Sequence, residues 1–127
     1  MNEYTTPISY RLYRYKFYLD ANHYIYASDG KKGAIHPHTW EFAIELKNRN
    51  GDFVPFNQIE ALINKILKPF QNICLNDVPP FDIIVPTLEN IGDYFKDMIA
   101  LKMDELNWEL LKVEISETPS RSYVIKA

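Results

Sequence analysis

Cysteine occurs once in the 127 residues, so no disulfide can form within the chain. A single thiol is typical of a reducing compartment, and we expect a cytoplasmic protein. No apolar run approaches the ~18 residues of a membrane span, and the N-terminus lacks the apolar segment of a signal peptide. The formal net charge of -3 favours neither nucleic acid nor an acidic membrane as a partner. We therefore expect one soluble globular domain over residues 1–127.

Alternating patterns predict two strands in the first half of the chain. Over residues 10–26 the odd positions become more apolar towards His23, so this side chain is expected to point where Phe17 and Leu19 point. Turn-forming residues follow at 27–35. From residue 36 a second strand alternates cleanly and ends in a turn at 48–52, which predicts one buried face.

Two amphipathic helices are predicted in the middle of the chain. Over residues 55–70 the apolar residues recur at steps of three and four, which is the period of a helix with one buried face. An irregular, proline-containing segment occupies residues 71–86. Thr87 is a candidate N-cap for the second helix, which is expected to run to about Asn107.

Two strands are predicted to close the chain. In the first, Leu111, Val113, Ile115 and Glu117 share one face, and the second covers residues 122–126. The resulting order is β-β-α-α-β-β. It predicts an α+β fold in which both helices cover one face of an antiparallel sheet.

The three histidines of the chain fall where one metal ion could bind all of them. Residues two apart in a strand point to the same face, so His36 and His38 present two imidazoles side by side. His23, from the preceding strand, would complete a three-histidine site with an open position, as in catalytic zinc sites. Imidazoles without a nearby thiolate suit Zn²⁺ best, with iron or nickel as alternatives. The other interpretation is three unrelated surface or core histidines.

The sequence pattern leaves the roles of four further residues open. Glu117 is either solvated where its strand leaves the core, or a carboxylate that accepts N–H groups of a ligand such as an amino-pyrimidine edge. Cys74 is either a small buried apolar residue or a nucleophile. Lys31 and Lys32, in a glycine-flanked loop, are either solvated or hold a phosphate.

Several short segments, in order and spacing, resemble the 6-pyruvoyltetrahydropterin synthase and 6-carboxytetrahydropterin synthase family. They read FYLDANH from Phe17, HPHTWEF from His36, LNDV from Leu75, PTLEN from Pro86 and VEISET from Val113. Each segment alone is a weak signal, whereas the ordered set is fairly specific and covers most of the chain.

The resemblance implies a fold, a metal and an assembly. The family has the tunnelling fold, in which the sheets of several subunits close into a barrel and the sites lie between subunits. Three family histidines bind zinc, and they match His23, His36 and His38. A homohexamer or homotetramer is expected, because barrel closure would also cover the edge strands of the sheet.

The resemblance also implies a ligand. The family's usual substrate is 7,8-dihydroneopterin triphosphate, and its enzymes are carbon–oxygen or carbon–carbon lyases. A family glutamate that anchors the pterin ring matches Glu117, with Thr118 beside it. The segment with Thr87 and Glu89 matches one that borders the pterin pocket at a helix start.

The chain departs from the family pattern at the proton-transfer positions. The family carries a cysteine a few residues before its H-x-H motif, whereas residues 29–35 contain no thiol. Gln71 and Asn72 stand at the family's Asp-His pair, and neither can act as a general base. Pro37 replaces the glycine between the two metal histidines.

These departures leave two functions open. One is a zinc-dependent pterin enzyme with a changed reaction or a substitute proton carrier, for which the available residues are Lys31, Lys32, Asp29 and Cys74. The other is a non-catalytic module that binds a pterin or purine-like ligand or serves as an oligomeric scaffold. Retained zinc ligands favour the first, and the missing acid–base groups favour the second.

Overall fold

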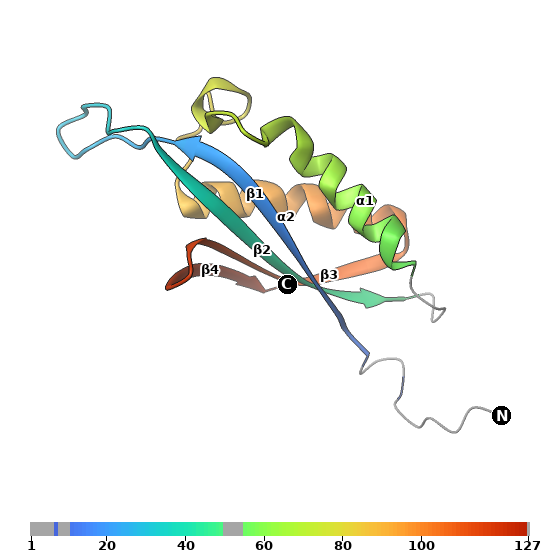
Figure 1. The fold of residues 1–127 in the computed structure, drawn as a ribbon. Coiled ribbons are helices and arrows are strands. Elements are labelled where there is room, and N and C mark those ends of the chain that lie inside the picture. Colours follow the sequence, from blue (N-terminus) through green and yellow to red (C-terminus); the bar gives the residue numbers. More distant parts are fainter. Residues whose placement is uncertain (1–6, 8–10, 50–54, 127) are drawn as a thin grey trace.

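The computed structural model describes residue 7, residues 11–49 and residues 55–126. In this part of the chain, four antiparallel strands form one sheet in the order β1-β2-β3-β4, and two helices cover one face of it (Figure 1). The strands are β1 (Tyr13–His23), β2 (His36–Asn48), β3 (Trp108–Thr118) and β4 (Arg121–Lys126). The helices are α1 (Phe56–Leu67) and α2 (Leu88–Glu105). The predicted α+β class and element order are confirmed.

The β1–β2 pair has the predicted parity. From Tyr15 onwards the odd positions of β1 are buried and the even positions are exposed, and His23 is buried as expected. β1 ends at His23, so the predicted extension to residue 26 is wrong: Tyr26 forms only an isolated bridge with Lys32. The connection that carries this bridge projects beyond the sheet (Figure 1). The predicted strand start at residue 10 and part of the predicted turn at 48–52 lie outside the described residues.

A β-bulge in β3 breaks the predicted alternation of the third strand. Glu45 pairs with Lys112 and Leu46 pairs with Leu110, so Leu111 is the extra residue. Leu110 is buried and Leu111 is only partly buried. The prediction that Leu111 lies on the buried face is therefore wrong, because the bulge changes the parity at this point.

The core lies between the sheet and the two helices. Each helix buries one stripe against the sheet, and full burial of one large apolar side chain stabilises the fold by roughly 1.5–3 kcal/mol. Thr87 caps α2, as predicted, by accepting a hydrogen bond from the main-chain N–H of Asn90. The helix ends at Glu105, close to the predicted end, and Asn107 has the left-handed φ of 61° that favours an asparagine after a helix.

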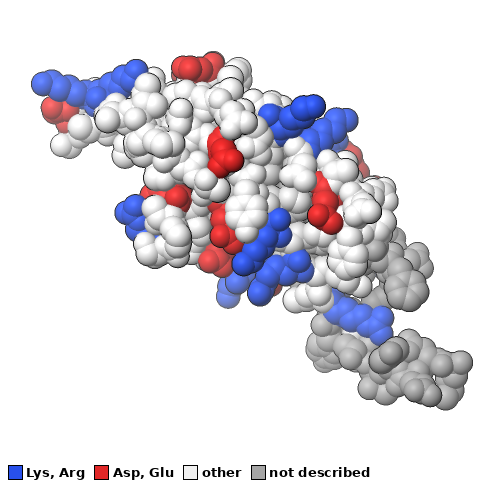
Figure 2. All heavy atoms as spheres, viewed as in Figure 1, with Lys and Arg blue, Asp and Glu red and all other residues white. Residues whose placement is uncertain are grey.

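The other face of the sheet is polar and charged. Arg14 pairs with Glu45 at 2.7 Å, and Lys16 pairs with Glu41 at 3.3 Å. Figure 2 shows acidic and basic side chains interleaved over the strands. Such exposed pairs stabilise the fold little, and they mark this face as the one that the helices do not cover.

Neither helix of the described residues combines the length and apolar character needed to cross a membrane.

Candidate metal centre

Three imidazoles meet at one end of the β1–β2 pair, on the face that the helices cover. The register places His23 opposite His36, and their ring centroids are 4.4 Å apart. His38 follows two residues later on the same face, with its centroid 5.1 Å from that of His23. One potential ligand atom from each residue lies within 4.8 Å of the others. The three histidines grouped by the sequence pattern therefore could hold a metal ion.

Main-chain carbonyls fix the orientation of two rings. His23 Nδ1 lies 2.8 Å from the Pro86 carbonyl oxygen, and His36 Nδ1 lies 2.9 Å from that of Ala34. A carbonyl oxygen only accepts, so Nδ1 donates and Nε2 of the neutral ring keeps a free lone pair. His23 Nε2 is buried and has no hydrogen-bond partner among the described residues. A buried, oriented nitrogen of this kind fits a metal ion.

Burial lowers the pKa of His23 and of His38. For His23, desolvation lowers the pKa most, the hydrogen bond to Pro86 opposes it, and the other two histidines lower it further. For His38, desolvation again has the largest effect and the Glu117 charge opposes it. Metals bind the neutral imidazole, so both shifts favour the form of the ring that can act as a ligand.

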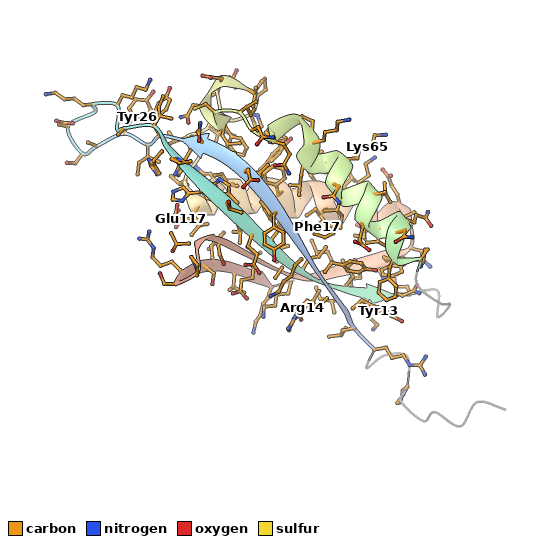
Figure 3. The ribbon with its side chains drawn as sticks, viewed as in Figure 1. Tyr13, Arg14, Phe17, Tyr26, Lys65 and Glu117 are labelled. Carbon is orange, nitrogen blue, oxygen red and sulfur yellow. The ribbon has the colours of Figure 1, made fainter. Side chains whose placement is uncertain are left out.

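One carboxylate lies beside the histidines. Glu117 Oε2 is 3.7 Å from His38 Nε2 and 3.9 Å from His23 Nε2, and Glu117 Oε1 is 3.3 Å from Arg121 Nη2. Figure 3 places Glu117 towards the end of the sheet from which the connection with Tyr26 projects. Its side chain is 17% exposed, so the strand has not left the core at this residue.

The start of α2 is tied to the histidine cluster. The Pro86 carbonyl binds His23, and the next residue, Thr87, caps the helix with its hydroxyl 3.1 Å from Asn90 N. Glu89 is exposed on the first turn of the helix. Thr118, next to the carboxylate of β3, has its hydroxyl oxygen 3.3 Å from that of Ser120.

Residues 13–127 match the family described as 6-pyruvoyl tetrahydropterin synthase. The chain belongs to this family. The family predicted from the short segments is thereby confirmed, and so is the subunit fold that the family implies.

Solved structures with the same fold include members of this family. The 6-pyruvoyl tetrahydropterin synthase of Caenorhabditis elegans has a TM-score of 0.75 at 18% identity, over 92% of this chain and 95% of that chain. A catalytic-residue mutant of the Plasmodium vivax synthase has a TM-score of 0.62 at 17% identity, over 92% and 98%. An uncharacterized protein of Wolinella succinogenes has a TM-score of 0.68 at 12% identity, over 91% and 97%. No curated protein matches the chain.

In this member of the pterin synthase family, the candidate proton carriers among the described residues are not part of the histidine cluster, although Cys74 forms a bridge with Asn22, the neighbour of His23. Lys31 and Lys32 are exposed in the projecting connection, and Lys32 Nζ lies 4.2 Å from the centroid of the Tyr24 ring. Cys74 Sγ faces Asn76 Oδ1 at 3.8 Å. Among the described residues, the cluster of potential metal ligands contains the three histidines and not Cys74.

Gln71 and Asn72, at the family's Asp-His pair, hold the chain against the edge of β1. The Gln71 side chain donates to the Tyr18 carbonyl and accepts from the main-chain N–H of Asp20, both at 2.9 Å. Asn72 N donates to the Asp20 carbonyl, and Asn72 has a left-handed φ of 62°. The Gln71 amide is thus engaged with the main chain.

Asn76 holds the chain immediately after His23 and was missed by sequence reasoning. Its side chain accepts from Tyr24 N and donates to the Tyr24 carbonyl, both at 3.0 Å. An amide can match the main-chain donor and acceptor of one residue, which explains why asparagine suits this position. The signal in the sequence was the LNDV segment, which indicated a family but not this contact.

Proposed function

We propose that the chain is a zinc-dependent enzyme that acts on 7,8-dihydroneopterin triphosphate or a related pterin. The observation that carries this proposal is His23 Nε2, which is buried beside two further imidazoles on a ring oriented by Pro86 and accepts no hydrogen bond from the described residues. Membership of the 6-pyruvoyl tetrahydropterin synthase family supports a pterin as the substrate class.

In this proposal His23, His36 and His38 hold the zinc ion. When bound, zinc would polarise the hydroxyl and carbonyl groups of the pterin side chain. Glu117, with Thr118 beside it, would bind the ring, because one carboxylate can accept two N–H groups from an amino-pyrimidine edge.

The pterin pocket would extend from this carboxylate to the start of α2. Thr87 and Glu89 would border it there, because the cap of α2 is tied to His23 through the Pro86 carbonyl. This arrangement would place the ring-binding carboxylate next to the metal site, because Glu117 Oε2 lies 3.7 Å from His38 Nε2.

The reaction would differ from that of the usual family members. General acid–base groups contribute ~10²–10⁴-fold in rate, and the family's cysteine and Asp-His pair have no equivalents here. Gln71 is engaged with the main chain of β1, and an asparagine such as Asn72 does not take up a proton. Lys31, Lys32, Asp29 or Cys74 would have to supply the proton transfer.

Turnover of a pterin tests this proposal directly. Zinc-loaded protein incubated with 7,8-dihydroneopterin triphosphate is expected to release triphosphate. A chelator should abolish the release and added zinc should restore it. Complete inertness with this compound and with several other reduced pterins would contradict an enzyme.

A second candidate function is a non-catalytic module that binds a pterin or a purine-like ligand. The structural use of Gln71 and Asn72 on the β1 edge favours it, because these positions then have no catalytic task. Ligand titration separates the two functions: tight binding that depends on Glu117 without any turnover supports the module.

We also propose that the protein is a homohexamer or homotetramer. β1 and β4 are the edge strands of the sheet, and unprotected edges tend to pair with other chains. Among the described residues, the segment from Gln71 to Cys74 covers the edge of β1 near Tyr18 to Asn22. Barrel closure between subunits would cover the remaining edges. A monomer in light scattering would contradict this assembly.

A further inference from the structure

The Glu117 carboxylate lies beside two of the three histidines, slightly beyond the spacing of two ligands of one ion. Among the described residues, the potential ligand atoms that lie within 4.8 Å of one another belong to the three histidines alone. Glu117 Oε2 lies 3.7 Å from His38 Nε2 and 3.9 Å from His23 Nε2. Tetrahedral ligands with bonds of about 2.0–2.2 Å to zinc lie roughly 3.3–3.5 Å from one another. A small rotation of the side chains would therefore bring this oxygen to the spacing of a fourth ligand.

Glu117 lies at a β-bulge between β3 and β4. Ser116 pairs with Ser122 and Thr118 pairs with Arg121, so Glu117 is the extra residue of β3 at this point. Bulges re-aim a side chain and are frequent next to active sites. Glu117 also keeps the parity of the buried Val113 and Ile115, so the backbone of β3 places its carboxylate on the face that carries the histidines.

Arg121 holds the other carboxylate oxygen. Its Nη2 lies 3.3 Å from Glu117 Oε1, which leaves Oε2 towards the histidines. The Glu117 side chain is 17% exposed, whereas that of Arg121 is 68% exposed, so the anion is the more desolvated partner. A cation on the histidine side would stabilise this carboxylate, and three neutral imidazoles alone would leave a divalent ion without a counter-charge.

We propose that Glu117 Oε2 is the fourth protein ligand of the metal while no pterin is bound, with Arg121 retaining Oε1. The pterin would then have to take the carboxylate from the metal before that carboxylate could anchor the ring. This inference rests on the zinc site of the proposed function, but it does not depend on turnover.

Replacing zinc with cobalt(II) tests whether Glu117 is a ligand. The visible absorption of Co²⁺ reports the coordination of the ion. The affinity of the loaded protein for azide reports whether a coordination position on the ion is free. In Glu117→Gln we expect Co²⁺ to bind at least about tenfold more weakly than in the wild type, and azide to bind the loaded protein at least about tenfold more tightly. Glu114→Gln is the matched control, because Glu114 lies on the same strand and accepts from Ser122 on the opposite face. It should leave both affinities unchanged.

Equal azide affinity in the wild type and in Glu117→Gln would overturn the inference. A crystal structure of the zinc-loaded wild-type protein without pterin gives a second test that does not depend on how the variant folds. A Glu117 carboxylate within bonding distance of the ion supports the inference, and one that points away from the ion overturns it.

The outcomes also separate this inference from the proposed function. Wild-type protein that binds no Co²⁺ would contradict both the fourth ligand and the zinc site. A metal ligated by Glu117 in a protein that converts no pterin would contradict the enzyme alone. Turnover with equal azide affinity in both proteins would contradict the fourth ligand alone.

Discussion

His23 lies directly opposite His36 in the antiparallel ladder of β1 and β2, with the two ring centroids 4.4 Å apart. A slip of one residue in this register would move every side chain of β1 to the other face. Leu19 and Trp40, the pair four residues along the same ladder, are both fully buried. The core therefore fixes the register that brings the two imidazoles together, and the metal site and the fold are specified by the same pairing.

The metal-free protein should lose stability as the pH falls below about 6.5. Burial lowers the pKa of His23 and His38 in the folded protein below the ordinary 6.5, so the unfolded chain takes up protons first. The contribution of these residues to the free energy of unfolding is present above that pH and is lost as the pH falls through the lowered pKa values. Urea unfolding of chelator-treated protein at a series of pH values measures it.

A control separates the histidines from other groups in this pH experiment. In His23→Phe the unfolding free energy should depend less on pH than in the wild type, because one buried neutral imidazole has been removed. An unfolding free energy of the wild type that stays constant on either side of pH ~6.5 would contradict the burial of neutral imidazoles.

Gly92→Ala should destabilise the protein although alanine favours helices. A Cβ at Gly92 would lie 2.8 Å from Tyr123 Cδ2 and 2.9 Å from Ile115 Cγ2. The gain in helix propensity is about 1 kcal/mol, and overpacking of this kind costs about 1–3 kcal/mol. We expect a net loss of up to about 2 kcal/mol in urea unfolding. A more stable Gly92→Ala variant would contradict the close approach of α2 to β3 and β4.

Tyr123→Phe should cost stability, whereas Tyr15→Phe should not. The Tyr15 hydroxyl is buried without a hydrogen-bond partner among the described residues, and desolvation raises its pKa to about 12. Its removal should leave stability unchanged or raise it by up to about 1 kcal/mol. The Tyr123 hydroxyl donates to Asp93 Oδ1 at 2.9 Å, so its removal should cost about 0.5–1.5 kcal/mol. Thermal or urea unfolding of both variants measures the difference, and equal losses would contradict it.

The sequence predicted the histidine cluster because β1 and β2 alternate without interruption from Phe17 to His23 and from His36 to Leu46. In such strands the parity of each residue decides its face, and proximity of the two strands follows from their antiparallel pairing. The same reasoning failed at Leu111, because a bulge depends on the neighbouring strand and leaves no mark in the local pattern.

The surroundings of the site could not be predicted for a related reason. Gln71 and Asn76 bind the main chain of residues that lie far from them in the sequence. A lone amide or carboxylate gives no periodic signal, so only the folded structure identifies its partner. The resemblance to the family identified Glu117 as a candidate ring-binding residue, but it did not predict how close this residue lies to the histidines.

The zinc content of reconstituted protein is the most direct test of the account. Wild-type protein and Thr39→Ala, a neighbouring change on the opposite face, should each retain about one zinc per chain after dialysis. His38→Ala should retain far less than that, because two imidazoles seldom hold zinc. Zinc content that is unchanged in His38→Ala, or a wild-type protein that binds no zinc, would contradict a metal centre built from His23, His36 and His38.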